Sequence, residues 1–498
     1  DKGEGKRTIN SWHEKQRILS FFGRLNYDFK DKYLLSFVFR RDGYSSLLGD
    51  NRWGFFPGVS AGWIFGREDF IKEAIPVMSF GKLRASYGIN GNASGIGAYT
   101  LQGSYGSSNS NGSFNYNGNT SYLITELPNP NLRWEKTATF EVGADLSFFA
   151  NRLNTNLTYY NRLTSDKYAA LSFPTSTGFS SVTNNNGEFR NQGIEIELSG
   201  KIIDSKDWTW SASGNIAFNK NKIVSLPDNG MERNRINAFQ VYTGNGDEKK
   251  WVGGQQEGQE PGILYLYQAD GIYRSYDEIP ANLVRKYGSR TYYGPEAWNK
   301  LTAEQQNATT NFPIQPGDTK FHDVNGDDVI DEFDKVKVGA TSPRWTGGFN
   351  TTLRWKNFQL YGRFDYALGF WLYENSGTQS TTPWFMGCYQ GTYNTPTMYY
   401  DTWSESNPNA KYPRYLFADQ NGKNNYIAST MFAYRGDYLA IREISLSYSL
   451  PESVAKMLKM QRAEVSITGQ NLGYITGAKN VGSPEANPKD NGAVGQGY

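Results

Sequence analysis

The chain has 498 residues, a formal net charge of +2 and a single cysteine, Cys388. The balanced charge gives no indication of nucleic acid as the main partner, and none is expected, whereas a lone cysteine excludes an internal disulfide framework or a multi-cysteine zinc site. Hydrophobic residues make up 38% and aromatic residues 15% of the chain, without a run of the roughly 20 apolar residues that a membrane-spanning helix requires. A transmembrane β-barrel and a soluble all-β protein with long polar loops both fit this composition.

Two long connections, residues 91–132 and 375–435, are polar and rich in Gly and Asn. Short turns join the predicted strands elsewhere, and this asymmetry is typical of the extracellular and periplasmic ends of a transmembrane barrel. Several tryptophans near predicted strand ends fit either an interfacial aromatic girdle or a packed core. They are Trp53, Trp63, Trp208 and Trp355.

Period-2 alternation is clearest over residues 138–148, where one face is apolar and the other is polar. The apolar face holds Ala138, Phe140, Val142, Ala144, Leu146 and Phe148. After the short turn at Ala150 and Asn151 the alternation continues over residues 153–160, which predicts a β-hairpin. Segments of about ten residues suit a tilted strand that crosses a bilayer, although a soluble strand buried on one side gives the same pattern.

Two further hairpins are predicted, one over residues 194–216 and one over residues 349–366. In the first, Glu195 and Glu197 share the face assigned to the lumen, where solvation explains them better than glycosidase chemistry. The last predicted strand covers residues 463–470. Roughly a dozen strands are expected in all, and because an open sheet edge in hydrocarbon leaves backbone groups unpaired, closure of the barrel is expected to need further sequence.

The sharpest local motif is DVNGDDVIDEFD, residues 323–334, within an acidic segment at 319–338 that we expect in an extracellular loop. Oxygen-bearing side chains recur at the spacing by which an EF-hand-type loop surrounds one Ca²⁺ ion. The expected ligands are Asp323, Asn325, Asp327, the backbone carbonyl of Val329, Asp331 and Asp334. Asp328 stands where the EF-hand has glycine, and an acidic loop of Asx-turns without any ion is the alternative.

Aromatic side chains interleave with Asn, Asp and Gln in residues 375–435, a composition that suits sugar rings or peptides but also suits packing between loops. The candidate substrate-binding residues are Trp384, Phe385, Tyr389, Tyr399, Tyr400 and Trp403. The sequence lacks the residue pattern of a His-dependent enzyme. The only histidines are His13 and His322, and neither accompanies a recognisable Ser or Cys nucleophile motif. The chain is therefore not expected to be an enzyme.

Segments along nearly the whole chain resemble the SusC/RagA-like TonB-dependent transporters of Bacteroidota outer membranes. The segments that carry the resemblance are FFGRLNYDFKDKYLLSFVFRRDGYSSL, NRWGFFPGVSAGWIFGREDF, FGKLRASYGINGN, LRWEKTATFEVGADLSFF, NQGIEIELSG, KVKVGATSPRWTGGFNTTLRWKNFQL, WSESNPNAKYPR, DYLAIREISLSYSLP and ITGQNL. They occur in the order expected for that family.

The resemblance implies a multi-pass, all-β transmembrane antiparallel barrel of about 22 strands in the family, of which residues 1–498 would hold roughly the C-terminal dozen. The plug domain, the first strands and the last strand are expected outside this chain. It further implies active import of glycans or peptides, driven by TonB–ExbB–ExbD through a missing N-terminal region. A SusD-like surface lipoprotein is the expected lid, and a passive porin or surface adhesin is the alternative.

Overall fold

The computed structural model describes residues 13–107, 115–116, 119–120, 122–373, 401–414, 427–478 and 483–485. The chain divides into two compact units. The first contains Asp1–Ile194, Asn221–Arg235 and Glu257–Gln259, and the second contains Glu195–Lys220, Ile236–Gln256 and Glu260–Tyr498. Within the described ranges no helix is both long enough and apolar enough to cross a membrane.

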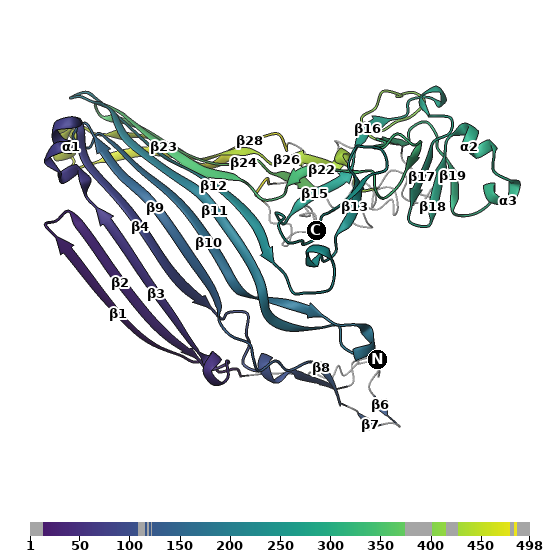
Figure 1. Ribbon diagram of the computed structural model, residues 1–498. Helices are drawn as coiled ribbons and strands as arrows, with labels where there is room; N and C mark the ends of the chain where they lie inside the picture. Colours follow the sequence, from purple (N-terminus) through teal and green to yellow (C-terminus); the bar gives the residue numbers. More distant parts are fainter. Residues whose placement is uncertain are drawn as a thin grey trace, which may run out of the picture. The chain divides into compact units, whose positions relative to one another are not determined.

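The first unit is built on long antiparallel strands that lie side by side in the order β1-β2-β3-β4-β9-β10-β11 (Figure 1). Their bounds are β1 (Ile18–Phe29), β2 (Tyr33–Tyr44), β3 (Trp53–Trp63), β4 (Met78–Asn92), β9 (Glu135–Phe148), β10 (Leu153–Ser172) and β11 (Ser181–Asp204), of which the part up to Ile194 belongs to this unit. A short helix, α1 (Asp69–Ala74), interrupts the connection between β3 and β4.

The strand registers align apolar side chains with apolar ones and polar side chains with polar ones, because side chains alternate between the two faces of a strand. One cross-strand row consists of Leu25, Phe37, Val59, Tyr87 and Phe140. The adjacent row on the other face consists of Asn26, Ser36, Ser60, Ser86 and Glu141. We call the face of the first row the outer face and that of the second row the inner face.

Apolar side chains on the outer face are exposed to a degree that a water-soluble sheet would not tolerate: Leu25 is 62% and Phe21 is 59% exposed. Lipid-facing strands carry such side chains because the bilayer, not a protein core, removes them from water. At the long-loop end, by contrast, residues of the 91–132 connection pack against the strands in a core cluster. Its buried members are Tyr44, Leu47, Phe56, Ala93, Ile96, Leu101, Leu132 and Trp134.

A polar junction ties together the short turns at the other end of β1–β4. The Glu68 carboxylate accepts hydrogen bonds from Lys32 Nζ at 2.7 Å, Tyr33 Oη at 2.9 Å and Trp63 Nε1 at 3.3 Å. These bonds lower the pKa of Glu68, the bond from Lys32 contributing most. The junction therefore links the β1–β2 turn to the β3–β4 connection.

The second unit holds the rest of β11 and a run of antiparallel strands in the order β12-β23-β24-β27-β28, of which β12 belongs to this unit only up to Lys220. Their bounds are β12 (Trp208–Ser225), β23 (Trp345–Trp355), β24 (Phe358–Leu368), β27 (Tyr438–Ser449) and β28 (Glu464–Thr476). The helix α5 (Glu452–Met457) lies in the connection between β27 and β28. Among the described residues the long strands number twelve, which agrees with the predicted dozen.

An aromatic row crosses these strands at their short-turn end. Trp208 and Trp355 are register partners with ring centroids 5.7 Å apart, and Trp355 and Phe358 follow at 6.0 Å. Phe358 contacts Tyr448 at 4.6 Å. Trp208 and Trp355 are each 43% exposed, so of the two alternatives for these two tryptophans the structure favours the girdle over a packed core.

The second unit also contains small sheets with a conventional core, in the chain between β12 and β23 (Figure 1). The strands are β13 (Phe239–Tyr242), β14 (Lys249–Val252), β15 (Ile263–Tyr267), β16 (Ala269–Ile272), β17 (Val284–Tyr287), β18 (Arg290–Tyr293), β19 (Asn311–Pro313), β20 (Thr319–Phe321), β21 (Val329–Ile330) and β22 (Lys335–Ala340), with helices α2 (Pro295–Asn299) and α3 (Ala303–Gln306). Tyr292 and Ile330 are almost completely buried in this core. No pattern in the sequence predicted this core.

Candidate functional site

Three regions of the described chain are candidate sites: a hollow on the inner face of the first unit, the acidic loop, and the segment around Trp403. The hollow has a volume of about 530 Å³. It forms over β1–β4 because the inner face there is floored by small residues. The floor residues are Gly58, Ser60, Gly62, Ser86 and Gly88.

A glycine pair lowers the floor of the hollow to the backbone itself. Gly58 and Gly88 are register partners, and a Cβ atom added to Gly58 would lie 3.8 Å from the Cα atom of Gly88. A second depression of about 670 Å³ continues from the first and shares Arg24, Ser36 and Glu141 with it. We call the two together the inner hollow.

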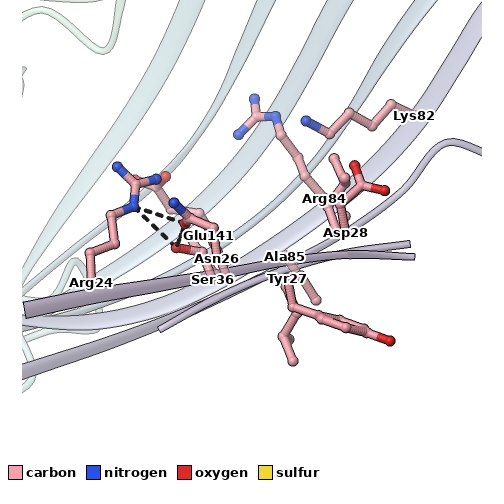
Figure 2. Close-up of a pocket in the computed structure, with 15 residues that line it drawn as sticks. Arg24, Asn26, Tyr27, Asp28, Ser36, Lys82, Arg84, Ala85 and Glu141 are labelled. Carbon is pink, nitrogen blue, oxygen red and sulfur yellow. Dashed lines mark hydrogen bonds between the residues drawn. The ribbon is translucent and has the colours of Figure 1, made fainter. Parts of the chain in front are cut away.

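Charged side chains rim the inner hollow, and Figure 2 shows Arg24, Arg84, Lys82 and Glu141 on one side of the strands while Tyr27 points away on the other. Arg84 is held across β9 because its register partner Gly143 has no side chain; a Cβ atom there would lie 2.7 Å from Arg84 Cζ. Arg84 Nε thereby reaches Asp145 Oδ1 at 3.4 Å and Arg84 Nη2 donates to Asn156 Oδ1 at 3.0 Å.

The remaining charges of the inner hollow are partnered unequally. Glu141 pairs with Arg162 at 3.3 Å, and Asp28 accepts a hydrogen bond from the backbone of Asp31 at 2.8 Å. Arg24 donates to the neutral oxygens of Asn26 and Ser36 (Figure 2). Among the described residues no carboxylate forms an ion pair with Arg24 or Lys82. This site was not predicted from the sequence, although the inward positions of NYDF and GKLRAS carry its polar side chains.

The acidic loop lies between β20 and β22, and its carboxylates bind the loop's own backbone. Asp323 accepts from the amides of Gly326 and Asp328, both at 2.8 Å. Fully buried Asp334 accepts from Val324 N at 2.9 Å and Asp331 N at 2.7 Å. Among the described residues no group of three acidic, histidine or cysteine side chains converges in a metal-binding arrangement. This hydrogen bonding is that of consecutive Asx-turns.

Two features of the loop nevertheless match a cation-binding loop. Asp328, at the sixth position, has a φ angle of 62°, the left-handed conformation for which an EF-hand uses glycine. Asn325 Oδ1 is buried and has no hydrogen-bond partner, while its Nδ2 donates to Asp247 Oδ1 at 2.8 Å. Burial, together with Asp331 and Asp323, raises the pKa of Asp334 to about 6. Hard cations such as Ca²⁺ are bound by several oxygen atoms. A buried oxygen without a hydrogen-bond partner, in a loop rich in carboxylates, fits such a set of ligands.

Of the predicted substrate-binding residues, only Trp403 lies in the described part of the chain. Trp384, Phe385, Tyr389, Tyr399 and Tyr400 lie outside the described residues. Their role remains a prediction.

Trp403 itself packs over the backbone at Gly317 and donates from Nε1 to the carbonyl of Arg274 at 3.3 Å. Nearby, Arg414 Nε pairs with fully buried Asp318 at 2.8 Å. The segment 401–414 is thus fastened to the small sheets of the second unit.

Comparisons with known proteins agree with this architecture. The family described as TonB dependent receptor-like, beta-barrel, matches residues 3–292. TonB-dependent receptor P3 of Formosa agariphila is 29% identical over 478 residues, which cover 96% of this chain and 43% of that receptor. TonB-dependent receptor SusC of Bacteroides thetaiotaomicron is 27% identical over 458 residues, covering 89% of this chain and 39% of SusC.

A solved structure of the RagAB peptide importer in its open-open state has a TM-score of 0.65 at 24% identity, covering 93% of this chain and 44% of that one. The RagAB peptide transporter has a TM-score of 0.63 at 23% identity, with 93% and 44% coverage. These likenesses show the fold. The chain spans less than half the length of each of these relatives.

Proposed function

This chain belongs to the TonB dependent receptor-like β-barrel family and is an outer-membrane protein of a Gram-negative bacterium, and from that premise we propose that it takes part in the uptake of oligomeric nutrients. One observation carries the proposal: the long strands expose apolar side chains on the outer face and gather charged and polar ones around a hollow on the inner face. A barrel with a polar interior provides a path through the bilayer for water-soluble cargo.

The proposed uptake is active, driven by the TonB–ExbB–ExbD complex, with a SusD-like surface lipoprotein as the lid. SusC and the RagAB importer, which share the fold, support this assignment. The proposed cargo is an oligosaccharide or a peptide. The relatives are named receptors, not enzymes, and we propose no covalent chemistry for Glu195 or Glu197, both of which are exposed on β11.

Uptake by whole cells tests the proposal. Cells with and without the gene would be given fluorescent oligosaccharides and peptides, each with and without a protonophore that removes the energy source of TonB. We expect accumulation that requires both the gene and the proton gradient. Accumulation that persists with the protonophore would favour the passive porin, and surface binding without accumulation would favour the adhesin.

Purification of the full-length protein from outer membranes tests the lid. We expect a surface lipoprotein to copurify in about equal amount and to reduce cargo binding when it is removed. Purification of the barrel alone under conditions that preserve lipoprotein complexes would contradict this part of the proposal.

We propose further that the acidic loop binds Ca²⁺ and thereby stiffens the segment between β20 and β22. Asp323, Asn325, Asp327, Asp331 and Asp334, with the carbonyl of Val329, are the candidate ligands, and the orphaned Asn325 Oδ1 supports the fit. Ca²⁺ would replace backbone amides as the partner of the carboxylates. Isothermal titration of the full-length protein tests this: heat on adding Ca²⁺ that disappears in Asp327→Asn supports the site, and no heat favours the Asx-turn alternative.

A further inference from the structure

We infer that the outer face of the first unit carries a site for one phosphate-bearing lipid of the surrounding membrane. The lipid phosphate pairs with Arg41, and an acyl chain of the same lipid occupies an apolar hollow beside Phe39. The inference concerns the lipid-facing side of the strand wall and does not depend on the proposed cargo. Three observations carry it: a cation without a protein partner, the depth of that cation on the wall, and the hollow on the same face.

Arg41 alone carries a charge among the described outward positions of β1–β4. Its register partners on the two neighbouring strands are Phe21 and Phe55, both of which are exposed. The guanidinium carbon lies 5.2 Å from the ring centre of Trp53. A charge on a lipid-facing surface is costly unless it meets water or an opposite charge. The outer face therefore holds a cation that needs an anion from outside the described chain.

The preceding residue shows what Arg41 lacks. Arg40 points to the inner face, where its Nε donates to buried Asp42 at 2.7 Å and its Nη2 donates to Ser20 Oγ at 3.2 Å. No described residue accepts a hydrogen bond from the Arg41 guanidinium or forms an ion pair with it. Packing against Trp53 covers one face of the guanidinium, whereas its N–H groups lie in the plane of the group. They remain available to an oxyanion.

The depth of Arg41 on the wall matches the level of lipid headgroups. Tyr33, at the short-turn end of the same strand, is eight residues away, which is about 26 Å along the strand. A strand tilt of about 40° reduces this to about 20 Å across the membrane, close to the apolar band of about 25 Å in such barrels. Tryptophans lie at both levels, Trp63 opposite Tyr33 and Trp53 beside Arg41. Because Arg41 lies toward the long-loop end, its phosphate partner belongs to the outer leaflet.

An apolar hollow of about 290 Å³ lies on the same face, next to Arg41 on the membrane side. Phe39 is two residues from Arg41, about 7 Å along the strand. The Phe39 ring covers its register partner Gly23, where an added Cβ atom would lie 2.2 Å from Phe39 Cζ. Because the ring leans over this glycine toward β1, space is left on the β3 side. The outward residues that line the hollow are Phe37, Phe39, Pro57, Val59 and Tyr87.

One lipid matches both features, because it joins a phosphate to apolar chains. The phosphate accepts charge-assisted hydrogen bonds from the guanidinium, and an acyl chain covers the apolar lining of the hollow. A second copy of the chain fits less well. In a two-fold symmetric contact this face would meet itself, and the outward positions of β1–β4 offer no carboxylate to Arg41. A free phosphate ion would leave the hollow unused.

Native mass spectrometry of the purified full-length protein, released from detergent micelles, tests the inference. The probes are dipalmitoyl phosphatidic acid, dihexanoyl phosphatidic acid, dipalmitoylglycerol, which lacks the phosphate, and inorganic phosphate. We expect dipalmitoyl phosphatidic acid to bind most tightly. Arg41→Gln should weaken its binding by about fivefold, as expected for one cation at an anionic lipid surface.

Matched variants separate the charge, the hollow and the fold. Arg41→Lys should retain most of the binding, and Arg24→Gln, which removes a cation from the inner face of the adjacent strand, should leave it unchanged. Val59→Trp fills the hollow with an apolar side chain that a lipid-facing wall tolerates. It should weaken binding of the dipalmitoyl lipid and leave the dihexanoyl lipid unaffected. The mobility of unheated samples in SDS gels confirms that each variant is folded.

Four outcomes would overturn the inference. Equal affinity for dipalmitoyl phosphatidic acid and dipalmitoylglycerol, or unchanged affinity in Arg41→Gln, would remove the phosphate from the site. Unchanged affinity in Val59→Trp would remove the acyl chain from the hollow. Inorganic phosphate that binds as tightly as the lipid would indicate an anion site alone. A dimer in the same spectra that Val59→Trp dissociates, with lipid binding unchanged, would show that a second copy covers the hollow. None of these outcomes bears on uptake by cells, which is measured separately.

Discussion

The long strands of the first unit and the small sheets of the second place the same aromatic and aliphatic residue types in opposite environments. On the outer face Phe140 is 44% exposed, whereas Tyr292 in the small sheets is 0% exposed. Tyr292 is enclosed by Phe312 and by Arg285, whose guanidinium lies 4.4 Å from its ring centre. The difference teaches that apolar residues do not by themselves predict a protein core, since in the strand wall the lipid takes the place of the core.

The largest effect is expected from removing a ring in the small sheets. Tyr292→Ala should cost about 3–5 kcal/mol because a cavity replaces a fully enclosed ring. Phe140→Ala on the outer face should cost much less, because an acyl chain can fill the space. The loss of stability in the two variants is measured by hydrogen exchange of amides in β17–β21 and by urea unfolding in lipid vesicles. Equal losses of stability in the two variants would contradict the contrast between the outer face and the core of the small sheets.

A charge placed on the outer face should have the next largest effect. Val142→Arg should destabilise the folded barrel by about 2–4 kcal/mol if the residue lies near the bilayer midplane. Thr137→Arg, on the inner face of the same strand, should be tolerated because that face is polar. Urea titration in vesicles, followed by tryptophan fluorescence, compares them. A similar loss for both variants would contradict the assignment of the faces.

Removing a ring from the aromatic row should reduce stability less than either of the two preceding changes. Trp355→Ala removes two ring contacts, to Trp208 and to Phe358, and should cost about 0.5–1.5 kcal/mol beyond the loss of buried area. The control is Leu360→Ala, which removes an exposed aliphatic side chain of β24. If the two variants have equal stability in vesicles, the row is not a stabilising girdle.

The Glu68 junction should have the smallest effect, because a single ion pair between residues of the turns adds little net stability. Its carboxyl pKa is lowered in the folded chain, so its contribution is present above the unfolded pKa and is lost as the pH falls through the folded value. Glu68→Gln should remove this acid-dependent loss, as seen in urea titrations at neutral and acidic pH. Glu73→Gln, on the short helix α1 that follows Glu68, should keep it. The same acid dependence in both variants would exclude Glu68 as its source.

Much of the strand wall could be predicted from local patterns. The alternation over residues 138–148 appears as β9, and the predicted turn after it is real: Phe149, Ala150 and Asn151 all have positive φ angles. The last predicted strand is longer than expected, since β28 extends to Thr476. The acidic motif could be recognised by its spacing. Whether it holds an ion is decided by donor convergence and burial, which spacing alone does not specify.

By itself the sequence determined the class of structure, because side-chain alternation has a period of two residues and is visible within one strand. Only the tertiary structure decided which inward residues meet. Asn26, Ser36 and Glu141 share one cross-strand row through registers across β1, β2, β3, β4 and β9, and Asp145, the register partner of Lys82, pairs instead with Arg84. Such pairing depends on contacts between residues far apart in the chain, so no local pattern could reveal it.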